Sequence, residues 1–224
     1  MARGSQRRRT RGGPARPGGG ADKRRLGRVE EYYDRRAREY DDWYRGTGLF
    51  SERDRPGWED ELARLTEVVA ALPPGRTLDV ACGTGFLTRY LRGEVVGLDQ
   101  SESMLEEARR NAPGARFLRG DAFELPVPDG SFDRVFTAHF YGHLEASNRQ
   151  TFLAEARRVA PELVVVDSSR KGSEKDEARQ ERVLNDGSRW EVYKRWFTPE
   201  RLAAELGGGE TLLGGRWFVA VRSS

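Results

Sequence analysis

Short apolar segments alternate with segments of helical periodicity through the middle of this chain, and this alternation limits the possible folds more than any other feature. The predicted strands are 77–82, 94–99, 115–120, 132–138 and 162–168. The predicted helices between them are 86–92, 101–111 and 146–160. Residues 163–166 are apolar without interruption, which is typical of a strand buried on both faces. The pattern therefore predicts an α/β fold in which helices cover both faces of a parallel sheet.

The segment before this region predicts two helices. Aromatic residues recur at three- and four-residue spacing over 28–45, and Gly46 ends that pattern. A second amphipathic helix is expected over 58–72, where Pro73 follows. We expect these helices to form a cap on the sheet.

The segment after this region predicts a hairpin and a short final unit. Asn185-Asp186-Gly187 is a turn pattern between 182–184 and 189–197. The last expected elements are a helix over 199–206, capped by Thr198, and two strands over 210–214 and 217–222.

Basic residues are concentrated at the N-terminus. Residues 1–28 hold ten basic residues and one acid, a net charge of +9, whereas the other 196 residues hold 29 basic and 35 acidic ones, a net charge of −6. The first segment is rich in Arg, Gly and Pro with almost no apolar residue, so we predict a disordered basic tail over 1–28. It is either a solvated extension or a weak contact for nucleic acid or another acidic surface. The remainder, 29–224, has the length of one domain.

The composition excludes several classes of protein. No apolar run approaches the roughly 20 residues that cross a bilayer, and no apolar segment of a signal peptide follows the first arginines. The single cysteine, Cys82, rules out a disulfide within the chain and a cysteine-based zinc site. We therefore expect a cytoplasmic protein without a membrane contact.

A glycine turn follows the first predicted strand, in the segment 79–86 (DVACGTGF). Glycines between a strand and a helix let a ligand approach the backbone. The turn lacks the lysine of a P-loop, and Thr88 stands where a dinucleotide fingerprint has its third glycine. Asp79, within the strand, suits a ligand with a cationic part better than a pyrophosphate.

Two further acids follow the next two strands, Asp99 and Asp121. Asp99 either accepts hydrogen bonds from both hydroxyls of a ribose or caps the next helix, for which Ser101 is the other candidate. Because ligands of open α/β sheets bind beyond the carboxyl ends of the strands, three acids at three successive strand ends favour a ligand site.

These motifs together resemble the class I S-adenosylmethionine-dependent methyltransferases. The resemblance rests on 79–86, on VVGLDQS at 95–101 with Met104 after it, on GDA at 120–122, and on LPVPDGSFDRV at 125–135. It implies a Rossmann-like, doubly wound, seven-stranded sheet with an antiparallel last strand and an N-terminal helical cap. The cap would cover 29–75 and the cofactor-binding sheet 76–224.

The resemblance also implies the residues that bind the cofactor, S-adenosyl-L-methionine, and its product S-adenosyl-L-homocysteine. Asp79, Gly83 and Gly85 would line the methionine end, with Ala81 where the family often has glycine. Asp99 would bind the ribose, with Gln100 and Met104 beside the adenosine. Asp121 would hydrogen-bond the adenine amino group, with the Ala122 backbone beside the ring and Phe123 against it.

Two residue types offer roles near the acceptor. Tyr32, Tyr33 or Tyr40 would reach the cofactor carboxylate or close over the site, or else only pack in the core. His139 and His143, just past the fourth strand of the parallel series, are candidates for a general base, and His139 also for cofactor contact or loop structure. No third ligand accompanies the pair, so no metal is expected.

The expected function is methyl transfer to a small-molecule acceptor, at O or N rather than C. The acceptor would lie between the sheet edge, the cap and 182–197, whose aromatic residues either stack on it or pack the sheet: Trp190, Tyr193, Trp196 and Phe197. The alternatives are an RNA or protein methyltransferase docking through the tail, and a cofactor-binding protein without activity. The acceptor and the oligomeric state do not follow from the sequence.

Overall fold

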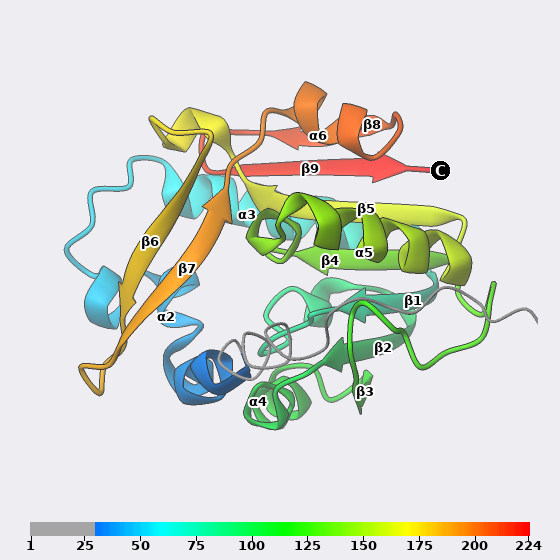
Figure 1. Cartoon of the computed structure of the whole chain (residues 1–224), viewed down its shortest axis with the longest axis horizontal. Helices are drawn as coiled ribbons and strands as arrows, with labels where there is room; N and C mark the ends of the chain where they lie inside the picture. The colour runs from blue at the N-terminus through cyan, green and yellow to red at the C-terminus, as the bar shows by residue number, and fades with distance from the viewer. Residues whose placement is uncertain (1–29) are drawn as a thin grey trace, which may run out of the picture.

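The computed structural model describes residues 30–224, so the predicted basic tail lies outside the described residues. Seven strands form one sheet in the order β3-β2-β1-β4-β5-β9-β8 (Figure 1). Their bounds are β1 Gly75–Val80, β2 Gly93–Asp99, β3 Arg116–Arg119, β4 Arg134–Ala138, β5 Glu162–Ser168, β8 Glu210–Gly214 and β9 Phe218–Ser223. All five predicted parallel strands are present, and they pair in parallel.

The strand order confirms the predicted doubly wound sheet. The chain runs outward from β1 to β3 and then returns to β4 on the other side of β1. The last strand, β9, runs antiparallel to both β5 and β8. The order reverses between β1 and β4, which is where open α/β sheets bind their ligands.

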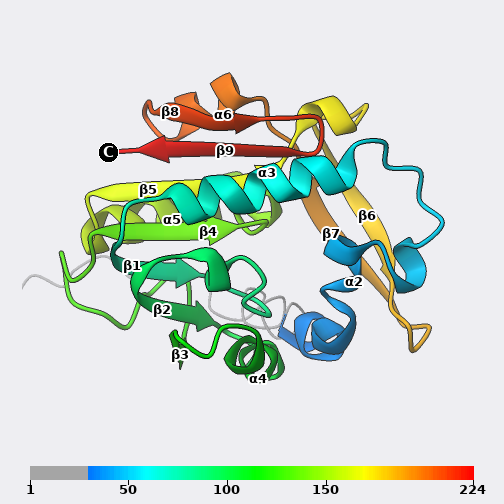
Figure 2. The same ribbon diagram turned by 180° about the vertical axis from the view of Figure 1, so that it is seen from behind.

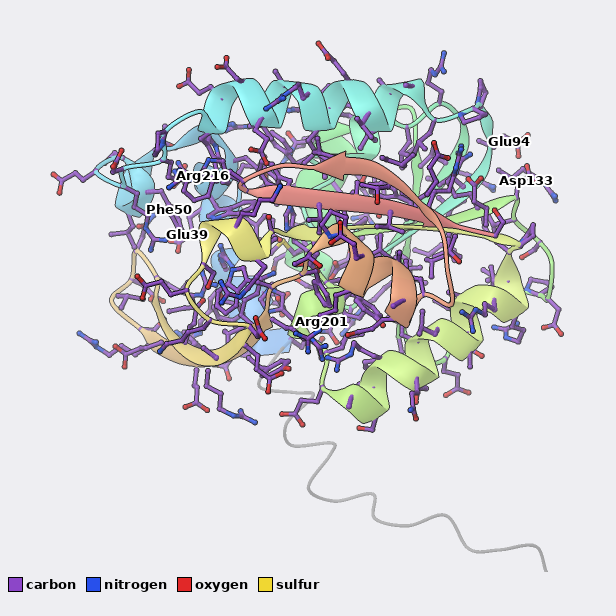
Figure 3. All side chains as sticks on the ribbon, turned by 90° about the horizontal axis from the view of Figure 1, so that it is seen from above. Glu39, Phe50, Glu94, Asp133, Arg201 and Arg216 are labelled. Carbon is purple, nitrogen blue, oxygen red and sulfur yellow. The ribbon has the colours of Figure 1, made fainter. Side chains whose placement is uncertain are left out.

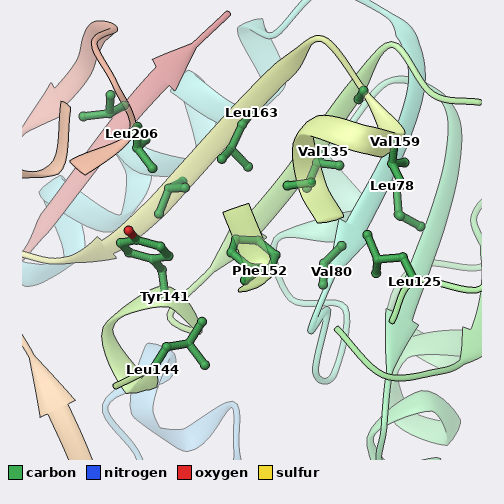
Figure 4. Packing of buried hydrophobic residues seen from close by; sticks show 14 of the residues in the cluster. Leu78, Val80, Leu125, Val135, Tyr141, Leu144, Phe152, Val159, Leu163 and Leu206 are labelled. Atoms are coloured by element: carbon green, nitrogen blue, oxygen red, sulfur yellow. The ribbon is translucent and has the colours of Figure 1, made fainter. Parts of the chain in front are cut away.

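Helices cover both faces of the sheet (Figures 1 and 2). Their bounds are α2 Asp42–Arg45, α3 Trp58–Ala71, α4 Glu102–Asn111, α5 Ala146–Val159 and α6 Pro199–Glu205. The alternation along β5 shows why two layers form: Leu163 and Val165 belong to the core on the side of α5, and Val164 and Val166 to the core on the side of α3. Figure 4 shows the first core, in which Tyr141 and Phe152 lie beside strand residues such as Val80.

The predicted single helix over 28–45 is wrong in its continuity. Residues 30–36 are helical, a 3-10 turn, η1, follows at Ala37–Glu39, and α2 is a separate short helix. Asp41, at the break, accepts hydrogen bonds from the Thr84 hydroxyl and from the Asn111 amide. These tertiary contacts outweigh the helical periodicity of the segment, and Gly46 ends α2 in the left-handed conformation, as expected.

The predicted helix over 86–92 is also wrong. Only a 3-10 turn, η3 Thr88–Tyr90, forms there. The Thr88 hydroxyl donates to Asp79, and β2 pairs with β1 from Gly93 onward, so few residues remain for a regular helix.

The predicted hairpin is present, with a longer first strand than expected and a second strand that ends at Arg195 rather than at residue 197. Strands β6 Glu177–Val183 and β7 Arg189–Arg195 form a two-stranded sheet of their own, and Gly187 has a positive φ in the turn between them. The hairpin turn contacts the cap, because the Asn185 backbone N–H donates to the Glu39 carboxylate over 2.9 Å. In Figure 3 Glu39 lies at the opposite end of the molecule from Glu94 at the start of β2 and from Asp133 just before β4. Cap and hairpin therefore meet at the end where the parallel strands finish.

No helix within residues 30–224 has the length and apolar character needed to span a membrane.

Candidate active site

The glycine turn after β1 holds the backbone close to β2 and α4. Ala81, Gly83 and Gly85 all have positive φ, of 57°, 54° and 73°. A Cβ on Gly85 would lie 3.1 Å from the α-carbon of Ala108, so a larger residue here would push α4 or the turn aside. Ala81 adopts the left-handed conformation as a non-glycine residue, which costs about 1–2 kcal/mol. The frequent glycine of the family at this position therefore has a physical reason.

Asp99, the last residue of β2, connects the turn to the next loop. It is 8% exposed, and its carboxylate accepts from the Gly83 N–H over 2.9 Å and from the Ser101 N–H over 3.0 Å. The Ser101 hydroxyl, and not Asp99, caps α4 by accepting from the Met104 N–H. Burial raises the pKa of Asp99, and its backbone donors oppose that shift.

A cavity lies over the carboxyl ends of β1, β2 and β4. Asp99 and Asp121 both line it, and one oxygen of Asp121 accepts from the Phe123 N–H over 2.8 Å. The cavity brings together most of the predicted cofactor residues: Tyr40, Ala81, Gly83, Asp99, Gln100, Met104, Asp121, Ala122, Phe123 and His139. We call it the first cavity.

Three predicted cofactor residues lie outside the first cavity. Tyr32 is buried beside Trp190, and its hydroxyl accepts from Arg36 over 2.8 Å, whereas its neighbour Tyr33 lines the cavity. Gly85 packs on α4. Asp79 lies in a small adjoining pocket that also contains Tyr40 and Ala81.

The small pocket holds an unpaired carboxylate oxygen. One oxygen of Asp79 accepts from the Thr88 hydroxyl over 2.6 Å, and the other is buried without a hydrogen-bond partner. Burial raises the pKa of Asp79 to about 7. Such an oxygen calls for a donor from a ligand, and an ammonium group is the donor that also favours the charged form. The pocket therefore fits the methionine end of the expected cofactor.

The two histidines lie where the first cavity meets a second one. Both line both cavities, as does Tyr40. His139 has a φ of 55°, packs its ring against Trp43 at 4.8 Å between centroids, and leaves both ring nitrogens buried without a partner. The Nδ1 atom of His143 lies 2.6 Å from the Tyr193 carbonyl, which can only accept, so Nδ1 carries the proton and Nε2 has a free lone pair.

Both histidines are neutral near pH 7. Burial lowers the pKa of His139 to about 3. Burial also lowers the pKa of His143 well below its usual value, and the nearby Lys194 ammonium adds to this effect. No group of His, Cys, Asp and Glu side chains within 30–224 is arranged to hold a metal ion.

The second cavity opens between the cap, the hairpin and the end of β5. Most of its lining side chains are aromatic or basic, among them Arg36, Trp43, Arg53, Arg55, Trp58, Arg182, Lys194, Trp196 and Trp217. Of the four aromatic residues expected near an acceptor, only Trp196 lines it. Phe197 is fully buried in the core, so its packing alternative holds.

Sequence reasoning missed the cations of this cavity, because they come from distant segments and form no local motif. One pattern could have revealed part of the set. The half-buried positions of β6 are Ala178, Gln180 and Arg182, and Lys194 of β7 pairs with Ala178. A hairpin face that is partly buried and polar indicates that the face lines a cavity and does not pack in a hydrophobic core.

Comparison with known proteins identifies the domain and the fold. Residues 78–162 match the model of a methyltransferase domain family. A complex of DhpI with SAM and HEP covers 89% of this chain and 97% of its own chain, at 25% identity and a TM-score of 0.70. Residues 78–162 therefore carry a methyltransferase domain, and the chain has the fold of S-adenosylmethionine-dependent methyltransferases. S-adenosylmethionine is the cofactor of such proteins, and the unpaired oxygen of Asp79 would accept a hydrogen bond from its ammonium group.

Two curated relatives of this chain are demethylmenaquinone methyltransferases. The protein of Thermotoga maritima is 39% identical over 101 residues, 43% of each chain. The protein of Thermus thermophilus is 40% identical over 116 residues, 46% of this chain and 52% of its own. The chain thus spans about half the length of the curated relatives it matches.

Proposed function

We propose that this chain transfers a methyl group from S-adenosylmethionine to a small-molecule acceptor, at oxygen or nitrogen. One observation carries the proposal: the cavity with the strand-end acids and the cavity under the hairpin share Tyr40, His139 and His143. A cofactor in the first cavity and an acceptor in the second would therefore meet at these three side chains.

The first cavity and its adjoining pocket would orient the cofactor. Asp79 would accept from the ammonium of the methionine end, and Asp99 from the ribose hydroxyls. Asp121 would accept from the adenine amino group beside Ala122 and Phe123. This support comes from residue positions: each acid ends or follows a strand of the parallel series, at the edge where such sheets bind ligands.

The reaction needs positioning more than acid–base chemistry. When bound, the cofactor would supply an electrophilic methyl group for a lone pair of the acceptor, and Asp79, Asp99 and Asp121 would hold it beside the second cavity. The aromatic side chains around His139 exclude water, and holding the two reactants in line supplies much of the acceleration. His143 Nε2 can accept a hydrogen bond from the hydroxyl or amine of a methyl acceptor. Because the pKa of His143 is lowered, this residue is a weak general base.

Two measurements on the full chain test the proposal. Calorimetry with S-adenosylhomocysteine should show binding, and incubation with S-adenosylmethionine and a panel of small oxygen and nitrogen acceptors should form S-adenosylhomocysteine with at least one of them. Binding without transfer across the panel would favour a cofactor-binding protein instead. Absence of binding would refute the proposal.

Docking of RNA or protein through the basic tail finds no support in the described residues, because the tail lies outside them. A cytoplasmic location is part of the proposal and rests on the single cysteine.

A further inference from the structure

The second cavity gathers positive charge in an otherwise acidic domain. Five cationic side chains line it, against the single carboxylate of Asp54: Arg36, Arg53, Arg55, Arg182 and Lys194. Residues 29–224 carry a net charge of −6. The cluster is therefore a local feature and not a reflection of composition.

The arginines of the cluster lack acidic partners. Within residues 30–224, none of Arg36, Arg53, Arg55 and Arg182 forms a salt bridge. On the outer face of the same hairpin, by contrast, Arg179 pairs with Glu145 over 2.7 Å and with Glu191 over 3.3 Å. On this hairpin, Arg179 on the outer face is therefore paired with carboxylates, whereas Arg182 on the inner face has no anionic partner within residues 30–224.

Arg182 shows the missing partner most clearly. One Nη2 hydrogen goes to the Gln180 side-chain oxygen over 2.7 Å, and Nε is buried without any partner. Burial lowers the pKa of Arg182, and the charges of Arg36 and Arg53 lower it further. An unpaired buried guanidinium nitrogen destabilises the folded chain, and a bound anion would remove that cost.

Lys194 brings the positive charge to the histidines. Its ammonium donates to Asp167 of β5 over 2.6 Å, and both side chains are buried. Asp167 also accepts from the Gly142 N–H over 2.7 Å, between His139 and His143. Asp167 therefore links Lys194 to the loop that carries His139 and His143, where the two cavities meet.

We infer that the acceptor carries an oxyanion group, a carboxylate or a phosphate, and that Arg182, together with Arg36 and Lys194, binds it. The inference rests on the proposed function, since it names the class of acceptor for that transfer. Arginine binds both groups through paired N–H donors, and the burial of Arg182 Nε strengthens its contact with an anion. A neutral acceptor would leave the four arginines of the cluster without an anion, so the cavity also selects against it.

A binding experiment tests the inference without a known acceptor. The full chain, saturated with S-adenosylhomocysteine, is heated in sodium phosphate, in sodium acetate, and in sodium chloride of equal ionic strength. Phosphate or acetate should raise the unfolding midpoint above its value in chloride, and the more effective anion identifies the group. Arg182→Gln should abolish the difference, and Arg179→Gln, on the outer face of β6, should keep it. No difference from chloride in the wild-type chain overturns the inference, even where Arg182→Gln is too unstable to assay.

A kinetic experiment separates this inference from the proposed function. Matched acceptors are compared: a carboxylic acid with its amide, and a phosphate monoester with a neutral triester. The charged member should have a kcat/KM at least about tenfold higher, the lower end of what one charge-assisted hydrogen bond supplies. Arg182→Gln should remove most of that preference, and Arg182→Lys only part. Equal transfer to both members overturns the inference and leaves the proposed function standing, whereas absence of S-adenosylhomocysteine binding refutes the function itself.

Discussion

Asp79 has one carboxylate oxygen bound to Thr88 and one without a partner, and its pKa is raised to about 7. At pH 6 the cofactor-free protein therefore holds this side chain mostly protonated. An ammonium group placed beside it lowers its pKa again, so binding must release a proton. The affinity for the cofactor should accordingly weaken as the pH falls below 7.

We predict that S-adenosylhomocysteine binding at pH 6 releases close to one proton. Calorimetry in two buffers of different ionisation enthalpy measures this number directly. Asp79→Asn, which cannot ionise, should release none. A wild-type enthalpy independent of the buffer at pH 6 would contradict the assignment of Asp79 to the methionine end.

Asp99 tests the ribose assignment. Replacing it by Asn removes the charge that strengthens hydrogen bonds to ligand hydroxyls, so the affinity for S-adenosylhomocysteine should fall about 10- to 100-fold. Asp60→Asn, on the exposed side of α3, is the matched control and should bind as the wild type does. Circular dichroism must show both variants folded, because Asp99 also holds Gly83 and Ser101. Unchanged affinity in a folded Asp99→Asn would rule out the ribose role.

Residues at strand ends were predictable, whereas residues that reach the site from far along the chain were not. Asp79 and Asp99 were found because the strand pattern and the glycine turn place them. Arg182 was missed because its role depends on which face of a hairpin turns inward and on what the cap leaves unpaired. Tyr33 and not Tyr32 lines the first cavity, because a one-residue step on a helix changes the face by about 100°.

At the scale of elements, α3 binds the β8–β9 turn through one buried side chain. Glu61 is 3% exposed, and its carboxylate accepts from the N–H groups of Arg216, Trp217 and Phe218 over 2.7–2.8 Å. Three backbone donors of this turn thus depend on a helix that lies far away in the sequence.

We predict that Glu61→Gln lowers the free energy of unfolding by about 1–3 kcal/mol. The amide NH2 replaces one carboxylate oxygen, so at least one of the three backbone N–H groups loses its acceptor. Urea denaturation measures the change. Glu59→Gln, exposed in the first turn of the same helix, should change the stability by less than about 0.5 kcal/mol. Equal stability of the two variants would show that water replaces the Glu61 contacts.

The elements that were predicted well are those whose own pattern agrees with their surroundings. The five parallel strands, α4 and the hairpin turn are of this kind. The helix over 28–45 and the helix over 86–92 failed because contacts elsewhere decided their backbone: Asp41 bonds to Thr84 and Asn111, and Thr88 bonds to Asp79. Neither contact leaves a local trace in the sequence.

At the scale of the whole molecule, the N-terminal residues 1–28 are basic and the remaining residues are acidic. Removing residues 1–28 changes the net charge from +3 to −6. The shortened chain should bind an anion-exchange column at pH 8, and its S-adenosylhomocysteine affinity should stay within about twofold, because residues 30–224 build both cavities. Loss of transfer to an RNA or protein substrate together with the tail, at unchanged cofactor affinity, would favour the RNA or protein alternative.

The hairpin β6–β7 is a sheet of its own, inserted between β5 and α6. Under the proposed function, acceptor choice could therefore evolve by exchange of this insertion while the cofactor sheet stays unchanged. The ion pair between Lys194 and Asp167 sets the condition for such an exchange. A transplanted hairpin without a cation at the position of Lys194 would leave the Asp167 carboxylate buried and unpaired. Such a chimera therefore also needs a neutral residue at position 167.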